Sequence, residues 1–201
     1  MSHYFETPSG TVVPHQIRAG IWGQNFSFTT AAGVFSGDRL DPGTAVLFRS
    51  VEPPAATVDR PHPRLLDLGC GFGPIAVALA TTCPEASVTA VDVNDRALEL
   101  TRLNAKRAEV SVTVQRPEDV PRDQLFDEIW SNPPIRIGKP ALHELLMTWL
   151  ARLDDGGCAY LVVGRNLGAD SLQTWLGNQG WPTARLASAK GYRVFRSVKA
   201  D

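Results

Sequence analysis

The chain has few cysteines, almost no net charge and no long apolar run. Its three cysteines, Cys70, Cys83 and Cys158, are odd in number and lack metal-ligand spacing, so we expect buried free thiols and no metal site. The net charge of −1 excludes bulk attraction to nucleic acid, so any RNA contact must come from a local basic face. Without a membrane-length apolar run or the charged and apolar regions of a secretory signal, we expect a soluble, cytoplasmic, monomeric protein.

The sequence also has no internal repeat and no low-complexity tract. Its 201 residues, 43% of them hydrophobic, are enough for one globular domain with a sizeable core. We therefore expect a single domain over residues 1–201. Within it, residues 1–63 form an N-terminal flap and a proline-rich linker, and residues 64–201 form the core.

From Arg64 onwards the chain alternates strand and helix patterns, which predicts an α/β fold with a parallel sheet and right-handed crossovers. A hairpin at the C-terminal end replaces another helical crossover. Before Arg64 we expect one or two short strands within residues 26–38 and a helix over 43–51. In the core we expect strands at 64–68, 87–93, 110–115, 126–131, 158–164, 183–189 and 192–198, and helices at 74–82, 95–108, 139–153 and 169–178.

A glycine-rich turn, R-L-L-D-L-G-C-G-F-G-P, spans Arg64 to Pro74. It predicts a buried strand, a tight turn and a helix start, with Gly69, Gly71 and Gly73 allowing a ligand to approach the main chain. The spacing is G-x-G-x-G, whereas the dinucleotide fingerprint is G-x-G-x-x-G. Asp67 precedes the first glycine and would repel a pyrophosphate. It could instead face a cationic ligand such as the amino group of S-adenosylmethionine.

Two acids follow the next two predicted strands. Asp92 lies near the end of the apolar run S-V-T-A-V-D-V, Ser87 to Val93, at the position that holds ribose hydroxyls in nucleotide-binding folds. Asp119 follows the strand at 110–115, where it either contacts an adenine amine or is merely solvated. These placements predict a nucleoside-containing ligand at the carboxyl edge of the sheet.

The loop S-N-P-P-I-R-I-G-K, Ser131 to Lys139, lies at the carboxyl end of the strand at 126–131. In an open α/β sheet this edge binds ligands, so the loop should face the glycine turn. Two consecutive prolines remove two N–H donors, and we expect unpaired carbonyl oxygens beside the Asn132 side-chain oxygen. That arrangement would hold an amino group. The alternative is a rigid turn that only ends the strand.

This chain resembles the class I S-adenosylmethionine-dependent methyltransferases. The resemblance rests on D-L-G-C-G-F-G at Asp67 to Gly73, Asp92 after the second core strand and N-P-P at 132–134, in this order. The longer N-P-P-I-R-I-G-K, with G-V-F-S at 33–36 and K-G-Y near the C-terminus, is similar to the small single-domain guanine-N2 ribosomal-RNA methyltransferases of the RsmC type. The resemblance implies a Rossmann-like fold, with a seven-stranded mostly parallel sheet, an antiparallel last strand and a β-rich N-terminal flap. It also implies S-adenosylmethionine as cofactor, and ribosomal RNA or the small ribosomal subunit as partner.

The resemblance assigns roles to three groups of residues. Ile135 stands where many N-P-P amine methyltransferases have an aromatic residue that stacks on the base. We therefore expect Phe35, or Phe28, of the flap to supply that flat surface. The alternative is that these rings only cover the edge of the sheet. The catalytic residues would be Asn132, Pro133 and Pro134. The cofactor would be bound by Asp67, Gly69, Cys70, Gly71, Gly73, Asp92, Val93, Asp119 and Asn132. The substrate would be bound by Phe35, Ile135, Arg136 and Lys139.

Two other functions remain open at the level of sequence. A protein-glutamine N-methyltransferase uses the same N-P-P cradle, but usually has an aromatic after it and a long helical N-terminal domain. A non-catalytic S-adenosylmethionine-binding scaffold would be expected to lack Asn132 or a motif glycine, and this chain keeps both. Methyl transfer to N2 of guanine in small-subunit ribosomal RNA is therefore the function we expect.

Overall fold

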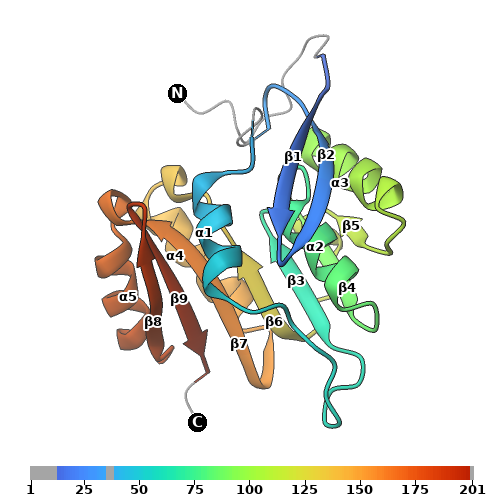
Figure 1. Ribbon diagram of the computed structural model, residues 1–201. Coiled ribbons are helices and arrows are strands. Elements are labelled where there is room, and N and C mark those ends of the chain that lie inside the picture. The colour runs from blue at the N-terminus through green and yellow to red at the C-terminus, as the bar shows by residue number, and fades with distance from the viewer. Residues whose placement is uncertain (1–12, 35–38, 200–201) are drawn as a thin grey trace.

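The computed structural model describes residues 13–34 and 39–199, which form a seven-stranded sheet and a separate two-stranded hairpin (Figure 1). The strands are β1 His15–Ile21, β2 Gln24–Thr30, β3 Arg64–Leu68, β4 Ser87–Val91, β5 Thr113–Gln115, β6 Phe126–Ser131, β7 Leu153–Gly164, β8 Thr183–Ala189 and β9 Tyr192–Val198. The helices are α1 Pro42–Ser50, α2 Pro74–Thr82, α3 Asp95–Arg107, α4 Lys139–Leu150 and α5 Ala169–Asn178, with short 3₁₀ turns η1 Pro117–Asp119, η2 Ile135–Ile137 and η3 Arg165–Leu167.

The strand order of the large sheet is β5-β4-β3-β6-β7-β9-β8. Strands β5 to β7 pair in parallel, whereas β9 pairs antiparallel with both β7 and β8. This arrangement confirms the predicted fold, including the antiparallel last strand. After β3 the chain continues to β4 and β5 on one side of β3, whereas β6 lies on its other side and is followed by β7. The loops that follow the adjacent strands β3 and β6 therefore lead in opposite directions. Such a switch point is where open α/β sheets bind ligands.

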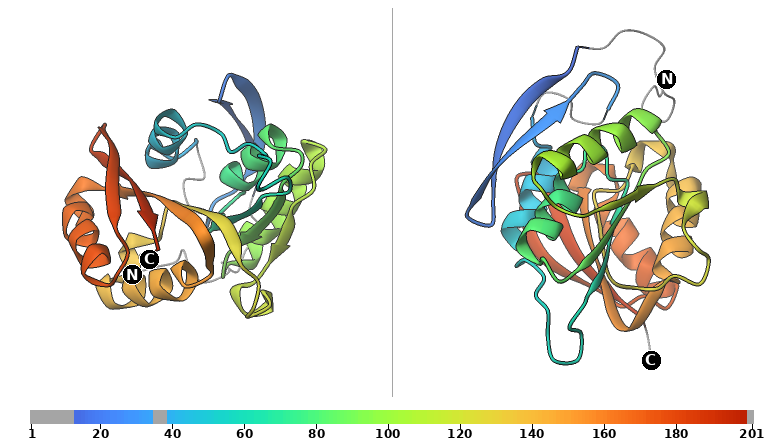
Figure 2. Two further views of the ribbon diagram at one scale, coloured as in Figure 1. Left: turned by 90° about the horizontal axis from the view of Figure 1, so that it is seen from below. Right: turned by 90° about the vertical axis from the view of Figure 1, so that its right-hand side faces the viewer.

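Successive residues of the central strands point to opposite faces of the sheet, and each face has its own core. Leu65, Trp130 and Val162 pack with α1, α2, α3 and the hairpin. Their strand neighbours Leu66 and Ile129 pack with α4 and α5. Both faces are thus covered by helices (Figure 2), which explains why residues 158–163 of β7 form a nearly continuous apolar run. None of the helices in residues 13–34 and 39–199 combines the length and apolar character needed to span a membrane.

The N-terminal hairpin β1–β2 packs on α3 and contributes to the main core. Phe28 is 1% exposed and contacts Phe26 and Phe72 in ring–ring arrangements. The Asn104 side chain of α3 accepts a hydrogen bond from the Thr29 N–H at 2.7 Å and donates to the carbonyls of Thr29 and Phe72, each at 2.8 Å. This buried amide therefore fixes the flap to the chain that follows the glycine turn.

Most predicted element boundaries agree with the structure, and the differences have local causes. Strand β1 was not predicted, although Ile17, Ala19 and Ile21 alternate with exposed residues as in a strand with one buried face. Strand β4 ends at Val91, two residues early, because the Val91 carbonyl accepts the N–H groups of Gly69 and Cys70 in the glycine turn. Helix α4 ends at Leu150 and β7 begins at Leu153, whereas we expected this strand to begin at 158.

We predict that Asn104→Ala lowers the free energy of unfolding by about 3 kcal/mol, because it leaves buried backbone groups of Thr29 and Phe72 without partners. Urea unfolding would measure the loss. Asn178→Ala, at the exposed end of α5, is the matched control and should stay within about 0.5 kcal/mol of wild type. A loss below about 1 kcal/mol for Asn104→Ala would show that the hairpin is held by its apolar contacts alone.

Candidate functional site

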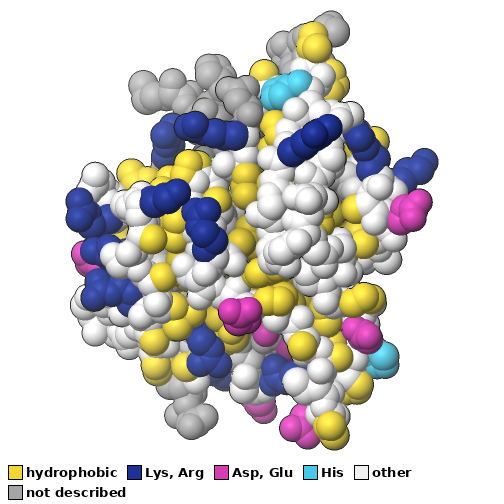
Figure 3. Space-filling view, in the orientation of Figure 1, with side chains coloured by type: hydrophobic (Ala, Val, Ile, Leu, Met, Phe, Trp, Pro, Cys, Tyr) yellow, Lys and Arg dark blue, Asp and Glu magenta, His cyan; other side chains and the backbone are white. Residues whose placement is uncertain are grey.

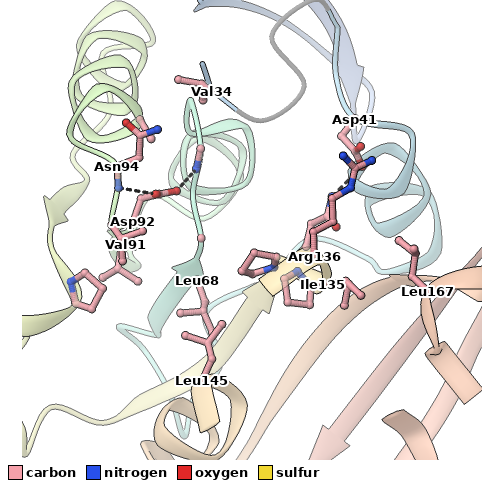
Figure 4. A pocket seen from close by; sticks show the side chains of 18 of the residues that line it. Val34, Asp41, Leu68, Val91, Asp92, Asn94, Ile135, Arg136, Leu145 and Leu167 are labelled. Atoms are coloured by element: carbon pink, nitrogen blue, oxygen red, sulfur yellow. Dashed lines mark hydrogen bonds between the residues drawn. The ribbon is translucent and has the colours of Figure 1, made fainter. Parts of the chain in front are cut away.

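A cavity of about 270 Å³ opens at the switch point, between the turn after β3 and the loop after β6 (Figure 4). One end is walled by the glycine turn and the chain after β4, and the other by the N-P-P loop, η3 and β9. Asn132 and Pro133 belong to this second end. Its lining residues are Val34, Asp41, Leu68, Gly69, Gly71, Val91, Asp92, Val93, Asn94, Ala97, Pro117, Asn132, Pro133, Pro134, Ile135, Arg136, Leu145, Gly164, Leu167 and Tyr192.

The three glycines of the turn serve two different purposes. All three have positive φ angles, 77° at Gly69, 57° at Gly71 and 88° at Gly73. A Cβ at Gly69 would meet no described atom within 4 Å and one at Gly71 would meet only Val34, at 3.9 Å, so both positions leave room for a ligand. At Gly73 a Cβ would lie 2.8 Å from the Thr101 side chain. Gly73 therefore allows α2 to pack on α3 and does not line the cavity.

Asp92 is held in the cavity wall by two backbone N–H groups. Its Oδ2 accepts from Gly71 and its Oδ1 from Asn94, each at 2.9 Å, and Figure 4 shows both bonds. Burial raises the pKa of Asp92, against the opposing effect of these hydrogen bonds. Each carboxyl oxygen has a second lone pair, so Asp92 can accept further hydrogen bonds from hydroxyl groups. Its fixed orientation fits the predicted contact with a ribose.

Asp67 lies behind the glycine turn, where we had expected direct contact with a cationic ligand. Its side chain is fully buried and does not line the cavity. Its Oδ2 accepts from the Ala76 N–H at 2.9 Å, whereas Oδ1 is buried without a partner among the described residues. Burial raises the pKa of Asp67 to about 8, and the nearby Asp92 raises it further. An orphaned acceptor beside the turn fits a cationic cofactor, because a positive charge nearby would stabilise the ionised carboxyl.

The N-P-P loop differs from our expectation in one respect. The Pro133 carbonyl, predicted to be unpaired, accepts from the Ile135 N–H at 2.8 Å, and the Pro134 carbonyl accepts from Ile137 at 3.1 Å. The loop turns tightly into η2, which brings these donors back to the proline carbonyls. The expected pair of unpaired carbonyls is therefore wrong, and the Asn132 side chain is the acceptor that the loop offers to a ligand.

The amide of Asn132 is oriented by two residues of the α1 N-terminus. Its Nδ2 donates to Asp41 Oδ2 at 2.7 Å and to Thr44 Oγ1 at 3.0 Å. Asp41 also accepts from the Thr44 N–H at 3.0 Å, as the N-cap of α1. Because a carboxyl oxygen attracts the NH₂ group and not the amide oxygen, Asn132 Oδ1 is turned away from Asp41. This leaves Oδ1 as an acceptor at the cavity wall.

Sequence reasoning missed Asp41. The segment D-P-G-T has the pattern of a helix start, with an acid at the N-cap and proline at the first helical position, so the local role was readable. Its place beside Asn132, 91 residues further along the chain, depends on how α1 packs against the sheet. Tyr192, Leu145 and Leu167 were also missed as lining residues.

Of the remaining residues predicted for the site, some line the cavity and others lie in the core, on the surface or outside the described residues. Val93, Ile135 and Arg136 line the cavity. Phe35 lies outside the described residues, and Phe28 is in the core and not at the cavity. Cys70 is buried with Sγ 3.4 Å from Thr101 Oγ1, and burial raises the pKa of its thiol. Asp119 and Lys139 are exposed and do not line the cavity, although Pro117 of η1 does.

The far end of the cavity is mainly apolar, with Ile135, Leu145, Leu167 and the ring of Tyr192. A flat apolar group carrying an amine could enter there and meet Asn132. Residues 13–34 and 39–199 contain no group of three or more His, Cys, Asp or Glu side chains arranged to bind a metal ion. The chemistry that this arrangement supports is the orientation of an amine between an apolar pocket and a ligand held by the glycine turn.

This chain is similar to known proteins over most of its length. Residues 25–196 match the family model of the methyltransferase small domain. The uncharacterized protein YbxB of Bacillus subtilis (strain 168) is 30% identical over 201 residues, covering 98% of both chains. The ribosomal RNA small subunit methyltransferase C of Shewanella sediminis (strain HAW-EB3) is 29% identical over 174 residues, covering 79% of this chain and 49% of that protein.

Among solved structures, the T. thermophilus 16S rRNA N2 G1207 methyltransferase (RsmC), in complex with AdoMet and guanosine, matches with a TM-score of 0.76 and 22% identity. The match covers 96% of this chain and 52% of that one. The chain thus spans about half the length of the ribosomal RNA methyltransferases that it matches, and nearly the full length of the Bacillus protein.

We predict that Asp67 makes the folded protein less stable as the pH rises from about 4 to about 8. Over this window the carboxyl is ionised in the unfolded chain but protonated in the folded one, so unfolding releases a proton. Asp67→Asn should remove this dependence. Urea unfolding at pH 5 and pH 8 should show a fall in wild type that exceeds the fall in Asp67→Asn by a few kcal/mol.

The exposed Asp123→Asn serves as the control and should keep the wild-type dependence. Equal slopes in Asp67→Asn and wild type would mean that Asp67 is already ionised when the chain is folded.

Proposed function

This chain belongs to the methyltransferase small domain family and is an S-adenosylmethionine-dependent methyltransferase of the RsmC type, and from that premise we propose that it methylates N2 of a guanine in small-subunit ribosomal RNA. The observation that carries the proposal is the fixed amide of Asn132, whose Nδ2 is occupied by Asp41 and Thr44. Its Oδ1 is left to accept an N–H from an incoming amine. A cytoplasmic location, where small subunits are assembled, follows from the proposed substrate.

The residues at the glycine end of the cavity would hold the cofactor. Gly69 and Gly71 leave space at the main chain, Asp92 offers its remaining lone pairs to the ribose hydroxyls, and Asp67 faces the positive charge from behind the turn. When bound, S-adenosylmethionine supplies an electrophilic methyl group, and its transfer releases a neutral thioether and a proton. Acid catalysis is therefore not required of the chain, and its main contribution is positioning.

At the other end, Asn132 orients the amine. The exocyclic nitrogen of guanine is a poor nucleophile because its lone pair is conjugated with the ring. A hydrogen bond from this amine to Asn132 Oδ1 fixes the direction of the nitrogen, and Ile135, Leu145 and Leu167 surround the base with apolar surface that excludes water. To enter this pocket, the base must be flipped out of its stack in the RNA, as happens in other enzymes that modify bases.

The surface around this end of the cavity is basic. Arg136 lines the cavity, and Lys139, Arg165 and Lys190 are exposed on neighbouring loops. The Arg165 N–H donates to the Gly191 carbonyl at 2.7 Å, which joins η3 to the β8–β9 turn. In Figure 3 most Lys and Arg side chains lie in the upper and left parts of the face, and most acids in its lower part. Such a local basic face would bind RNA phosphates despite the net charge of −1.

The proposal is tested by methyl transfer from labelled S-adenosylmethionine to small ribosomal subunits and, separately, to the RNA extracted from them. Both should come from cells that lack the gene for this chain, so that the target is unmodified. Nucleoside analysis is expected to find N2-methylguanosine. Label in another nucleoside, or in glutamine of a protein, would reject guanine-N2 as the target.

We predict that two single variants separate cofactor binding from transfer. Asp92→Ala should weaken S-adenosylhomocysteine binding by at least about tenfold, because Asp92 holds the turn through Gly71 and would bind the ribose. Asn132→Ala should leave that affinity within about threefold of wild type and lower the transfer rate by at least about 100-fold. Titration calorimetry and methyl transfer measure the two effects. Equal loss of cofactor affinity in both folded variants would contradict this division of roles.

We also predict that Arg136 and Lys139 contact phosphates. The double variant Arg136→Gln/Lys139→Gln should bind RNA more weakly and reduce the slope of log affinity against log salt concentration by about 0.7 per lost contact. Arg122→Gln is the control, because Arg122 is exposed in the loop before β6, at the opposite edge of the sheet. An unchanged slope in the double variant would assign both residues a structural role.

A further inference from the structure

We propose that Asp41 recognises the target base by accepting the ring N1–H of guanine, next to the amine that Asn132 holds. This inference rests on the proposed guanine substrate and adds the residue that would select guanine over other bases. Asp41 would thus bind the substrate directly, in addition to capping α1 and orienting Asn132.

The position of Asp41 fits this role. It lines the cavity at the end where Asn132 lies, and it is half-buried. Its Oδ2 already accepts from Asn132 Nδ2 and the Thr44 N–H, but its Oδ1 has no hydrogen-bond partner in the part of the chain that the structure describes. Asn132 Oδ1 and Asp41 Oδ1 therefore form a pair of neighbouring acceptors, joined through the Asn132–Asp41 hydrogen bond.

A pair of acceptors matches guanine, but not adenine, cytosine or a glutamine side chain, which also carry an amino group. The edge of guanine carries the N1–H beside the N2 amine, so two neighbouring positions both donate. Adenine and cytosine have an unprotonated ring nitrogen beside their amine, and a glutamine side chain has a carbonyl oxygen there. Each of these would place an acceptor against Asp41. The Pro133 carbonyl already accepts from the Ile135 N–H, whereas Asp41 Oδ1 accepts from none of the described residues, so Asp41 is the better second acceptor.

The surroundings of Asp41 hold its carboxyl in place. A Cβ added at Gly43 would lie 2.8 Å from Asp41 Oδ2 and 2.8 Å from Tyr192 Cε1, so the carboxyl and the ring both pack against this glycine. Burial, and then the proximity of Asp41, raise the pKa of Tyr192, so its ring stays neutral beside the carboxyl. Tyr192 lines the same end of the cavity and offers the aromatic surface that Ile135 lacks.

The experiment compares two nucleosides that differ in the protonation of N1. Guanosine and 2-aminopurine riboside both carry the 2-amino group, but only guanosine has an N1–H. Each is titrated into the full chain saturated with S-adenosylhomocysteine, and the dissociation constant is measured from NMR chemical shifts. Wild type should bind guanosine at least about tenfold more tightly than 2-aminopurine riboside.

Asp41→Asn is a nearly isosteric variant. Its amide oxygen can still accept from Thr44 and Asn132, while its NH₂ group replaces Oδ1 and donates. The preference for guanosine over 2-aminopurine riboside should therefore fall by about 100-fold, with an unchanged preference in the control Asp123→Asn. An unchanged preference in Asp41→Asn, or equal binding of both nucleosides by wild type, would overturn the role of Asp41 and leave the methyltransferase proposal intact.

Failure of wild type to bind guanosine at all would instead reject the guanine substrate and, with it, this inference. If Asp41→Asn does not fold, as judged by its melting temperature, Gly43→Ala replaces it, because the added Cβ displaces the Asp41 carboxyl. Because the same Cβ would also press on the Tyr192 ring, both nucleosides should bind more weakly, but guanosine should lose about tenfold more affinity than 2-aminopurine riboside. Equal weakening of both nucleosides would overturn the inference.

Discussion

The two hydrogen bonds from Asn132 Nδ2 to Asp41 and Thr44 are the contacts on which the site depends. They join the end of β6 to the start of α1, and they fix the Asn132 side chain so that its oxygen is an oriented acceptor. The prolines alone would not achieve this, because their carbonyls are occupied by η2. The loop supplies rigidity, and α1 supplies the direction in which Asn132 points.

Three acids around the cavity have different functions because their environments differ. Asp67 is fully buried, and its pKa is raised to about 8, so it responds to a charge placed at the turn. Asp92 is fixed by two backbone donors and keeps lone pairs for hydroxyl groups. Asp41 is half-buried, and its Oδ2 accepts hydrogen bonds from the Thr44 N–H and from Asn132 Nδ2. The same side chain is thus buried with an unpaired oxygen, fixed by two backbone donors or bonded to an amide, and under the proposed function these environments would suit a positive charge, ribose hydroxyls and the orientation of Asn132.

The N-terminal hairpin belongs to the site as well as to the core. Asn104 fixes β2 next to the chain that leaves the glycine turn, and the Asn94 side chain donates to the Gly33 carbonyl at 3.1 Å. These contacts bring Val34 to the cavity wall, 3.9 Å from the place of a Gly71 Cβ. A segment that precedes the sheet in sequence therefore closes one side of the cavity.

From Arg64 onwards, the sequence by itself determined the order of strands and helices, the glycine turn, Asp92 and Asn132, because hydrophobic periodicity and turn chemistry are local properties. It also placed these residues at one edge, since the carboxyl ends of parallel strands lie together. Only the tertiary structure decided that Asp67 is buried behind the turn, that Asp119 lies outside the cavity, and that Asp41 and Tyr192 meet beside Asn132. The burial of Asp67 depends on the packing of α2 on β3, and the meeting of Asp41 and Tyr192 on the packing of α1 against β7 and β9. These contacts join separate segments of the chain and leave no signal in either segment alone.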